Sequence, residues 1–294
     1  MRPAESKLFF SVTLMITRLL GRFSRRASGP AAARLWFTPW KIAFAPRARE
    51  IQAGWMQGAA EMSFETSVGP IAARAKGRGP AVLLVHGWGE SGASLGAFIA
   101  PLVDAGYRAV AIDLPGHGAS RGGQTHGFEL AAAIREVATA LGGVRAVIAH
   151  SMGAFGTLIA LHEGLRANAV VLVAPTSRLD HAFATFCEFL SLPPRAADGL
   201  RRAIERRFGR NAWREISGRA FIDGVDVPAL VLHDRDDPQV SLDDSTELVS
   251  EWPSARLIVT EGMGHDRALR SEDLRPTILG FIRDSARSTE VVPA

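Results

Sequence analysis

The feature that most constrains the fold is a run in which an apolar stretch ends at a serine, Val147-Ile148-Ala149-His150-Ser151-Met152-Gly153-Ala154. The residues before the serine favour a strand, and the small residues after it continue as a helix. So sharp a turn strains the backbone of its central residue. The strand and the helix can approach each other only if the residues two positions away are small, as Ala149 and Gly153 are. The turn exposes the Ser151 hydroxyl at the carboxyl edge of a sheet and leaves the Met152 backbone N–H free for an oxyanion. The sequence therefore predicts Ser151 as a nucleophile.

Strand-like and helical patterns alternate on both sides of this turn. The expected strands are residues 82–85, 109–112, 146–149, 169–174, 229–232 and 256–259, after an opening hairpin of residues 62–68 and 71–75; the expected helices between them are 94–105 and 128–141. The first of these parallel strands is apolar without alternation, which is typical of a strand buried on both faces of a sheet. This order predicts an α/β protein with a doubly wound, mostly parallel sheet.

The alternation stops between residues 178 and 223, where the apolar residues recur at helical spacing. Pro193 and Pro194 divide this segment into two amphipathic helices, the second with an arginine-rich outer face. We expect these helices to form a cap, or lid, over a core made of residues 61–177 and 224–294. Residues 1–60 are expected to form a helical N-terminal extension.

A serine hydroxyl needs a base to accept its proton and a carboxylate to orient that base. Of the eight histidines, only His265 lies in a Gly-x-Gly-His loop after the final strand. Three aspartates, Asp234, Asp236 and Asp237, follow the strand of residues 229–232. The chain therefore has the order serine, aspartate, histidine, and only one of the three aspartates can hold the imidazole.

Four segments resemble the α/β-hydrolase family, from about residue 62 to residue 282. They are the strand that ends in His86-Gly87-Trp88-Gly89-Glu90, the loop Asp113-Leu114-Pro115-Gly116-His117-Gly118-Ala119-Ser120, the turn at Ser151, and the late Gly264-His265. The family's turn usually begins with glycine, whereas this chain has Ala149 there. The resemblance implies a helical cap and the order of nucleophile, acid and base seen here.

The resemblance also implies a role for particular residues. Relatives carry the acid about four residues past the strand, commonly followed by proline and then by valine two positions on, which fits Asp237-Pro238-Gln239-Val240. Asp237 is therefore expected to orient His265. The second oxyanion donor is expected to be the N–H of Trp88, beside that of Met152, with Ala149, His150 and Gly153 forming the turn around Ser151.

These residues predict a serine hydrolase that cleaves carboxylic esters of small or medium apolar acyl groups through an acyl-enzyme. The same residues would serve a thioesterase, an amidase or aminopeptidase, a lipase or an acyltransferase, and fold alone does not separate them. A non-catalytic binding protein on the same fold is an alternative of another class. No cofactor and no metal are expected, because no cluster of ligand residues has metal spacing and no glycine-rich phosphate loop is found. The single cysteine, Cys187, excludes an internal disulfide.

The positive charge of the chain is concentrated at its amino end. The net charge is +4, but residues 1–60 hold ten Arg or Lys against two Glu, so the remainder is −4. No recognition motif accompanies this charge, and nucleic acid is not an expected partner. The apolar residues 8–17 are too few to cross a bilayer before Arg18, and the arginines that follow disfavour an exported protein. We expect a cytoplasmic protein whose residues 1–30 form a helix that either lies on a membrane surface or packs on its own domain.

Overall fold

The structure, a computed structural model, describes residues 3–40 and 46–287. Residues 1–2, 41–45 and 288–294 belong to the predicted N-terminal extension and to the end of the predicted core. They lie outside the described residues.

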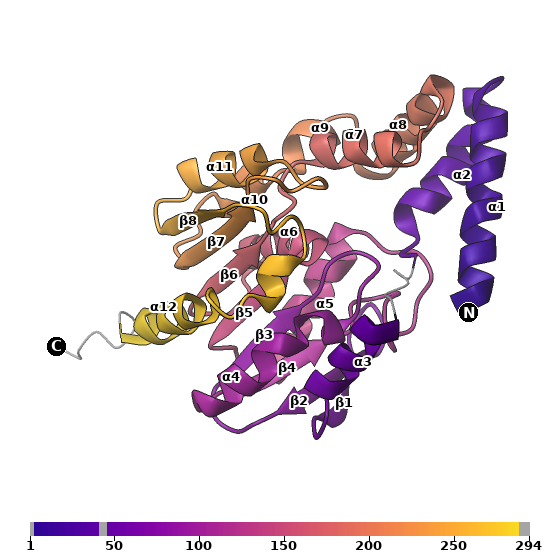
Figure 1. Cartoon of the computed structure of the whole chain (residues 1–294). Helices are drawn as coiled ribbons and strands as arrows, with labels where there is room; N and C mark the ends of the chain where they lie inside the picture. Colours follow the sequence, from indigo (N-terminus) through magenta and orange to yellow (C-terminus); the bar gives the residue numbers. More distant parts are fainter. Residues whose placement is uncertain (1–2, 41–45, 288–294) are drawn as a thin grey trace.

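An eight-stranded sheet forms the centre of the molecule (Figure 1), in the order β1-β2-β4-β3-β5-β6-β7-β8. The strands are β1 (Ala60–Phe64), β2 (Ile71–Lys76), β3 (Ala81–Val85), β4 (Arg108–Ile112), β5 (Ala146–His150), β6 (Val170–Val173), β7 (Ala229–Asp234) and β8 (Ala255–Thr260). β1 and β2 form the predicted antiparallel hairpin, and β2 pairs antiparallel with β4. The remaining neighbours pair in parallel, which confirms the predicted doubly wound sheet.

The central strands supply side chains to a separate core on each face of the sheet. In β3, Leu83 and Val85 belong to one core, and Val82 and Leu84 belong to the other. The first core is covered by α5 (Gly127–Ala140), α6 (Ser151–His162), α10 (Gly218–Ile222) and α11 (Leu242–Ser250), and the second by η1 (Gly92–Phe98), α4 (Ile99–Asp104), η2 (Arg267–Arg270) and α12 (Arg275–Arg287). Burial of both faces explains why these strands lack a polar alternation.

The helix predicted over residues 94–105 is divided. It begins as the 3₁₀ segment η1 and becomes α-helical only in α4. η1 contains Gly92 and Gly96, and glycine has a low propensity for the α-helix. A Cβ at Gly96 would lie 2.7 Å from Cβ of Trp55, so a larger residue there would clash with this neighbour.

The predicted N-terminal extension and the predicted cap share a hydrophobic core. The N-terminal helices are α1 (Pro3–Gly21), α2 (Arg25–Phe37) and α3 (Pro46–Trp55), and the cap contains α7 (Leu179–Phe189), α8 (Pro194–Phe208), α9 (Ala212–Glu215) and α10. Ala32 and Phe37 of α2 pack with Leu200 and Ile204 of α8. Trp36 of α2 also contacts two phenylalanines of α7. The extension therefore packs against the cap, and in the described residues no helix is long and apolar enough to span a membrane.

The helices α2 and α8 touch through their backbones at a pair of glycines. A Cβ on Gly29 would lie 3.0 Å from the carbonyl oxygen of Gly199, and a Cβ on Gly199 would lie 2.7 Å from the carbonyl oxygen of Arg25. Backbone atoms cannot rotate away as a side chain can, so these glycines permit the close approach of the two helices.

Adding the same methyl group at two glycines should have opposite effects. Gly199→Ala should destabilise the protein by about 1–2 kcal/mol, because α2 and α8 must separate to admit the methyl group. Gly54→Ala, in α3, should be neutral or stabilising by up to about 1 kcal/mol, because a Cβ there meets nothing within 4 Å. Thermal unfolding and limited proteolysis of the N-terminal helices measure both effects. Equal effects of the two substitutions would contradict the close crossing.

Candidate active site

Ser151 lies at the junction of β5 and α6 in a strained conformation. Its φ is 50°, in the left-handed region that non-glycine residues rarely adopt. A Cβ at Gly153 would lie 2.2 Å from the carbonyl oxygen of His86, so no larger residue fits there without movement of the backbone. Ala149 is fully buried between Val85 of β3 and Leu172 of β6. The predicted turn is thus built by close packing between β5, α6 and the end of β3.

The turn after β3 lies directly beside Ser151. A Cβ on Gly87 would lie 3.2 Å from Cβ of Ser151. Among the described residues, none accepts a hydrogen bond from the backbone N–H of Trp88 or of Met152. Met152 is in the first turn of α6, where N–H groups have no partner within the helix and the helix dipole favours a negative charge. These two donors can serve a developing oxyanion next to Ser151.

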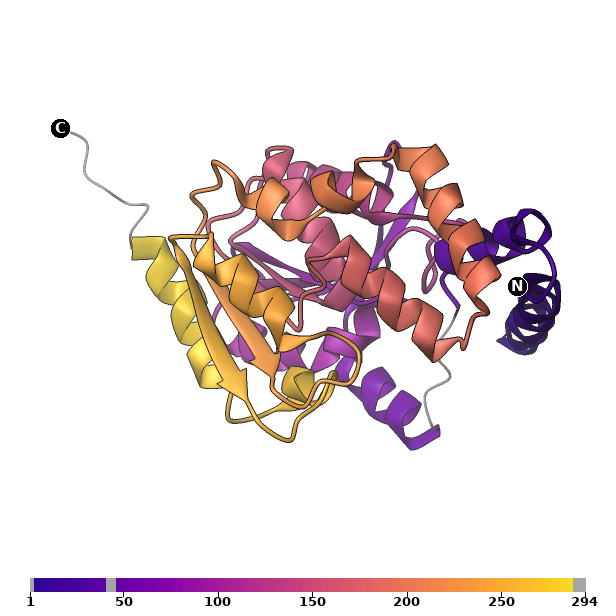
Figure 2. The ribbon, with the colours of Figure 1, turned by 90° about the horizontal axis from the view of Figure 1, so that it is seen from above.

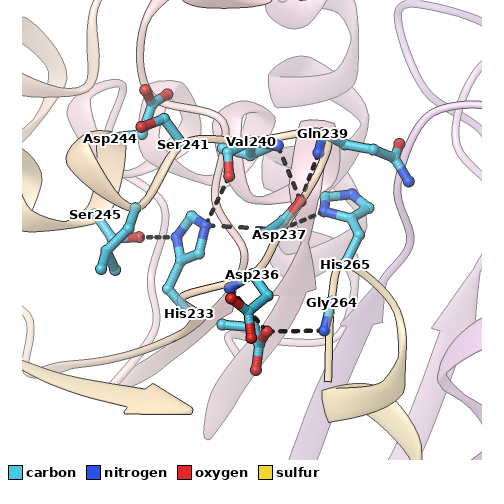
Figure 3. A network of polar contacts seen from close by, with 12 residues as sticks. His233, Asp236, Asp237, Gln239, Val240, Ser241, Asp244, Ser245, Gly264 and His265 are labelled. Carbon is cyan, nitrogen blue, oxygen red and sulfur yellow. Dashed lines mark hydrogen bonds and ion pairs between the residues drawn. The ribbon is translucent and has the colours of Figure 1, made fainter. Parts of the chain in front are cut away.

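Asp237 and His265 form a buried hydrogen-bonded pair (Figure 3). His265 Nδ1 donates to Asp237 Oδ2 at 2.7 Å, and the two side chains are 6% and 1% exposed. Asp237 Oδ1 accepts from the backbone N–H groups of Gln239 and Val240, at 2.8 and 3.0 Å. Burial alone would raise the pKa of Asp237, but the bond to His265 and these N–H groups lower it overall. The Asp237 carboxylate is therefore ionised at neutral pH, and it accepts a hydrogen bond from the protonated Nδ1 of His265.

His265 is held near Ser151, the predicted nucleophile, by His150, the residue just before Ser151. His150 Nε2 donates to the carbonyl oxygen of His265 at 3.2 Å, and the two rings have centroids 4.6 Å apart. The hydroxyl of Ser151 makes no hydrogen bond to His265 among the described residues. Hydrogen bonds of this kind are often long until substrate is bound. The structure thus brings the predicted acid and base together and places both beside the Ser151 turn.

Asp234 and Asp236 hold the loop that carries His265. Asp234 accepts hydrogen bonds from the N–H groups of Met263 and Gly264, both at 2.9 Å, and Asp236 Oδ2 accepts from that of Gly262 at 3.0 Å. Asp234 also accepts from the Thr260 hydroxyl at 2.7 Å. Burial would raise the pKa of Asp234, but these donors lower it. The sequence showed only that these aspartates follow a strand, and it could not show that the two bind a loop about thirty residues later.

A second histidine supports the other side of Asp237. His233 Nε2 donates to the carbonyl oxygen of Val240 at 3.0 Å and lies 3.6 Å from Asp237 Oδ2 (Figure 3). Its Nδ1 lies 2.6 Å from the Ser245 hydroxyl. His233 is fully buried at the end of β7, so these contacts fix the 237–240 turn. Nothing in the sequence distinguished this histidine from a structural one.

A buried ion pair connects the three loops of the site. Glu90 Oε2 accepts from the N–H of Gly87 at 3.1 Å, and its Oε1 lies 3.4 Å from His150 Nδ1. Burial opposes ionisation of both groups, but their mutual attraction lowers the pKa of Glu90 to about 2 and raises that of His150. Glu90, His150 and the His265 carbonyl thus join the turn after β3, the Ser151 turn and the histidine loop. A glutamate just after a buried apolar strand was the available sequence signal for this pair.

Among the described residues, one group of side chains has potential metal-ligand atoms close to one another. His150, His265 and Asp266 each offer an atom within 4.8 Å of the others. The sequence did not predict this group, because His150 is far along the chain from His265 and Asp266. A histidine must be neutral to bind a metal ion, whereas Glu90 favours the protonated form of His150. His150 Nε2 already donates to the carbonyl oxygen of His265, so it has no lone pair free to bind a cation.

Known proteins of several kinds are similar to this chain. The model of the alpha/beta hydrolase family matches residues 82–277. A pimeloyl-[acyl-carrier protein] methyl ester esterase of Methylococcus capsulatus is 52% identical over 44 residues, which are 15% of this chain and 17% of that protein. A non-heme haloperoxidase of Rhodococcus erythropolis is 27% identical over 70% of this chain and 93% of that protein. The solved structure of the Pyrococcus furiosus esterase Pf2001 has a TM-score of 0.66 at 19% identity, covers 84% of this chain and 97% of its own, and shows the likeness of fold.

The Glu90–His150 pair should make stability depend on pH in a defined way. Glu90 has a lowered pKa in the folded state, so its contribution is present above about pH 4.5 and is lost as the pH falls towards 2. His150 has a raised pKa, so its contribution is present below pH 6.5 and is lost as the pH rises through the folded value. Glu90→Gln should therefore cost about 3 kcal/mol near pH 5.5 and less towards pH 3. Urea unfolding of both proteins across this range tests the pair, and a cost that grows on acidification would contradict it.

Proposed function

Because the family model spans two thirds of its length, this chain belongs to the alpha/beta hydrolase family, and we propose that it is a serine hydrolase of carboxylic esters. The observation that carries the proposal is the arrangement around Ser151. A buried Asp237–His265 pair lies beside the strained turn, and the N–H groups of Trp88 and Met152 have no partner among the described residues. A base oriented by a carboxylate and two oxyanion donors are the groups that acyl transfer needs.

In the proposed acylation step, the Ser151 hydroxyl oxygen attacks the ester carbonyl while His265 Nε2 accepts its proton. The carbonyl oxygen becomes negative, and the N–H groups of Trp88 and Met152 stabilise it. Asp237 keeps His265 in the tautomer that leaves Nε2 free, and it stabilises the imidazolium that forms. His265 then gives the proton to the leaving alcohol, and the acyl group remains on Ser151.

Deacylation uses the same groups with water in place of serine. His265 takes a proton from water, the resulting hydroxide attacks the acyl carbonyl, and the tetrahedral species again places its oxyanion between the two N–H donors. Collapse returns the proton to the oxygen of Ser151 and releases a carboxylic acid. No step requires a cofactor, since each proton moves between Ser151, His265 and the substrate or water.

The position of the cap supports an apolar acyl group as substrate. The N–H of Thr176 donates to the carbonyl oxygen of Ser151 at 3.4 Å, three residues before α7 begins at Leu179. In the view from above, α7 runs across the middle of the sheet (Figure 2). We propose that this helix covers the acyl group of the substrate. The names of similar proteins, a methyl ester esterase and an esterase, support an ester as the scissile bond.

Removal of the nucleophile or the base should abolish turnover. Ser151→Ala and His265→Ala should each lower kcat by about 10⁴-fold or more, because the members of such a triad act as one unit. The assay is hydrolysis of p-nitrophenyl esters from acetate to palmitate, with the highest kcat/KM expected for short or medium chains. Near wild-type activity of purified Ser151→Ala would contradict the mechanism, and no turnover of any ester by the wild type would favour a binding protein.

The three neighbouring aspartates allow a matched test of the acid. Asp237→Asn should lower kcat by about 10³–10⁴-fold, because an amide can stabilise the wrong tautomer of His265 and cannot balance its positive charge. Asp236→Asn, which alters a bond to the loop backbone but not to the ring, should stay within about tenfold of the wild type. Steady-state kinetics on proteins of matched thermal stability compare the two. If Asp236→Asn were the slower enzyme, the acid would have to be reassigned.

A further inference from the structure

The helix α1 has a row of large apolar side chains on the side that faces away from the protein. Five residues at helical spacing form an exposed stripe, with the exposed fraction of each as follows: Val12 39%, Met15 61%, Ile16 40%, Leu19 56% and Phe23, just beyond the helix, 73%. Residues three, four and seven positions apart share one face of a helix, so these side chains form one continuous surface. We refer to it below as the α1 stripe.

The side of α1 that packs on the protein combines one aromatic contact, between Phe10 and Trp40 with ring centroids 4.2 Å apart, with small and polar residues. Thr17 is fully buried and bonds to the Thr13 carbonyl oxygen at 2.7 Å, and a Cβ on Gly21 would lie 2.8 Å from Cβ of Ala196 in α8. A helix that only covers its own domain keeps its large apolar residues inward and does not leave a row of them exposed. The sequence left two alternatives open for this helix, and the structure shows that α1 packs on the cap while its apolar stripe stays free.

Polar contacts hold α1 in this orientation. The Arg18 guanidinium donates two hydrogen bonds to the carbonyl oxygen of Leu190 at the end of α7, at 2.9 and 2.8 Å. Arg195 of α8 donates to the carbonyl oxygens of Arg22 and Phe23, at 2.9 and 3.2 Å. The helix therefore cannot turn its stripe inward without breaking bonds to two helices of the cap.

The helices at this end of the molecule carry a large positive net charge. Residues 3–37 and 194–208, which contain α1, α2 and α8, hold eleven Arg or Lys against three Asp or Glu, a net charge of +8; the other residues, 23 against 27, have a net charge of −4. Arg22 and Arg26 are exposed next to the stripe. Figures 1 and 2 both place α1 at one outer edge of the molecule, on the side opposite α12. A flat surface can thus reach the stripe without touching the rest of the protein.

From these observations we propose that α1 docks on an anionic lipid bilayer, with its stripe among the lipid tails at the interface and the arginines against the headgroups. An apolar face flanked by arginines is the pattern of a helix that lies in a membrane interface. Pairing of two copies through the same stripe would bring two basic ends together, and their repulsion opposes that arrangement. An anionic surface satisfies both the apolar side chains and the charge.

The test is cosedimentation of the full-length protein with vesicles of phosphatidylcholine, alone or with about 30% phosphatidylglycerol. We expect binding to the mixed vesicles at low salt, and weaker binding to the same vesicles at about 0.5 M NaCl or to neutral vesicles. Leu19→Gln/Phe23→Gln should lower the partition coefficient by about tenfold or more, because two exposed apolar side chains no longer enter the interface. Arg22→Gln/Arg26→Gln should reduce the dependence on salt.

A matched control removes the same kind of side chain elsewhere on the surface. Ile51 and Val259 are 46% and 38% exposed and lie outside the stripe, so Ile51→Gln/Val259→Gln should bind vesicles as the wild type does. All variants should keep the wild-type turnover of soluble esters, since none of these residues belongs to the active site. The proposal fails if the wild type ignores anionic vesicles at low salt, or if the stripe variant binds as well as the control. It also fails if light scattering shows a wild-type dimer that the stripe variant abolishes.

Discussion

The active site depends on a buried pair of opposite charges. Glu90 and His150 are both buried, and removing one partner would leave the other charge buried without compensation. Glu90 binds the turn that carries one proposed oxyanion donor, and His150 binds the loop that carries His265. Since His150 directly precedes Ser151, these contacts fix the relative positions of the proposed nucleophile, base and oxyanion donor. Electrostatic catalysis requires that these groups be in place before the charge develops.

Three aspartates, at the end of β7 and in the loop after it, together hold His265 in place. Asp237 holds the ring, whereas Asp234 and Asp236 hold the backbone just before it. Each carboxylate accepts backbone N–H groups that would otherwise be without a partner, so the loops need no secondary structure of their own to be rigid.

At the opposite end of the molecule, the two N-terminal helices α1 and α2 have different roles. There α2 shares a core with the cap, whereas α1 leaves five large apolar side chains, from Val12 to Phe23, exposed to solvent.

The sheet could be predicted from the sequence because apolar runs and helical spacing are local patterns, and the strands of residues 82–85 and 229–232 lie where they were expected. The turn at Ser151 could also be predicted, since its small residues answer a local steric demand. The contacts of Glu90 with His150 and of Asp234 with the 262–264 loop could not, because they join segments far apart in the chain. The packing of α2 on α8 escaped prediction for the same reason. Glycines such as Gly199 have meaning only when the opposite helix is known.

The central claim is that Ser151 attacks a carbonyl whose oxygen is held by two backbone N–H groups. The most direct measurement is a crystal structure of the protein after reaction with an alkyl fluorophosphonate, whose phosphonyl group resembles the tetrahedral intermediate of ester hydrolysis. The account predicts phosphorus bonded to the hydroxyl oxygen of Ser151, with one phosphonyl oxygen about 3 Å from the backbone nitrogens of both Trp88 and Met152. An unmodified Ser151, or an adduct whose oxygen contacts neither nitrogen, would contradict it.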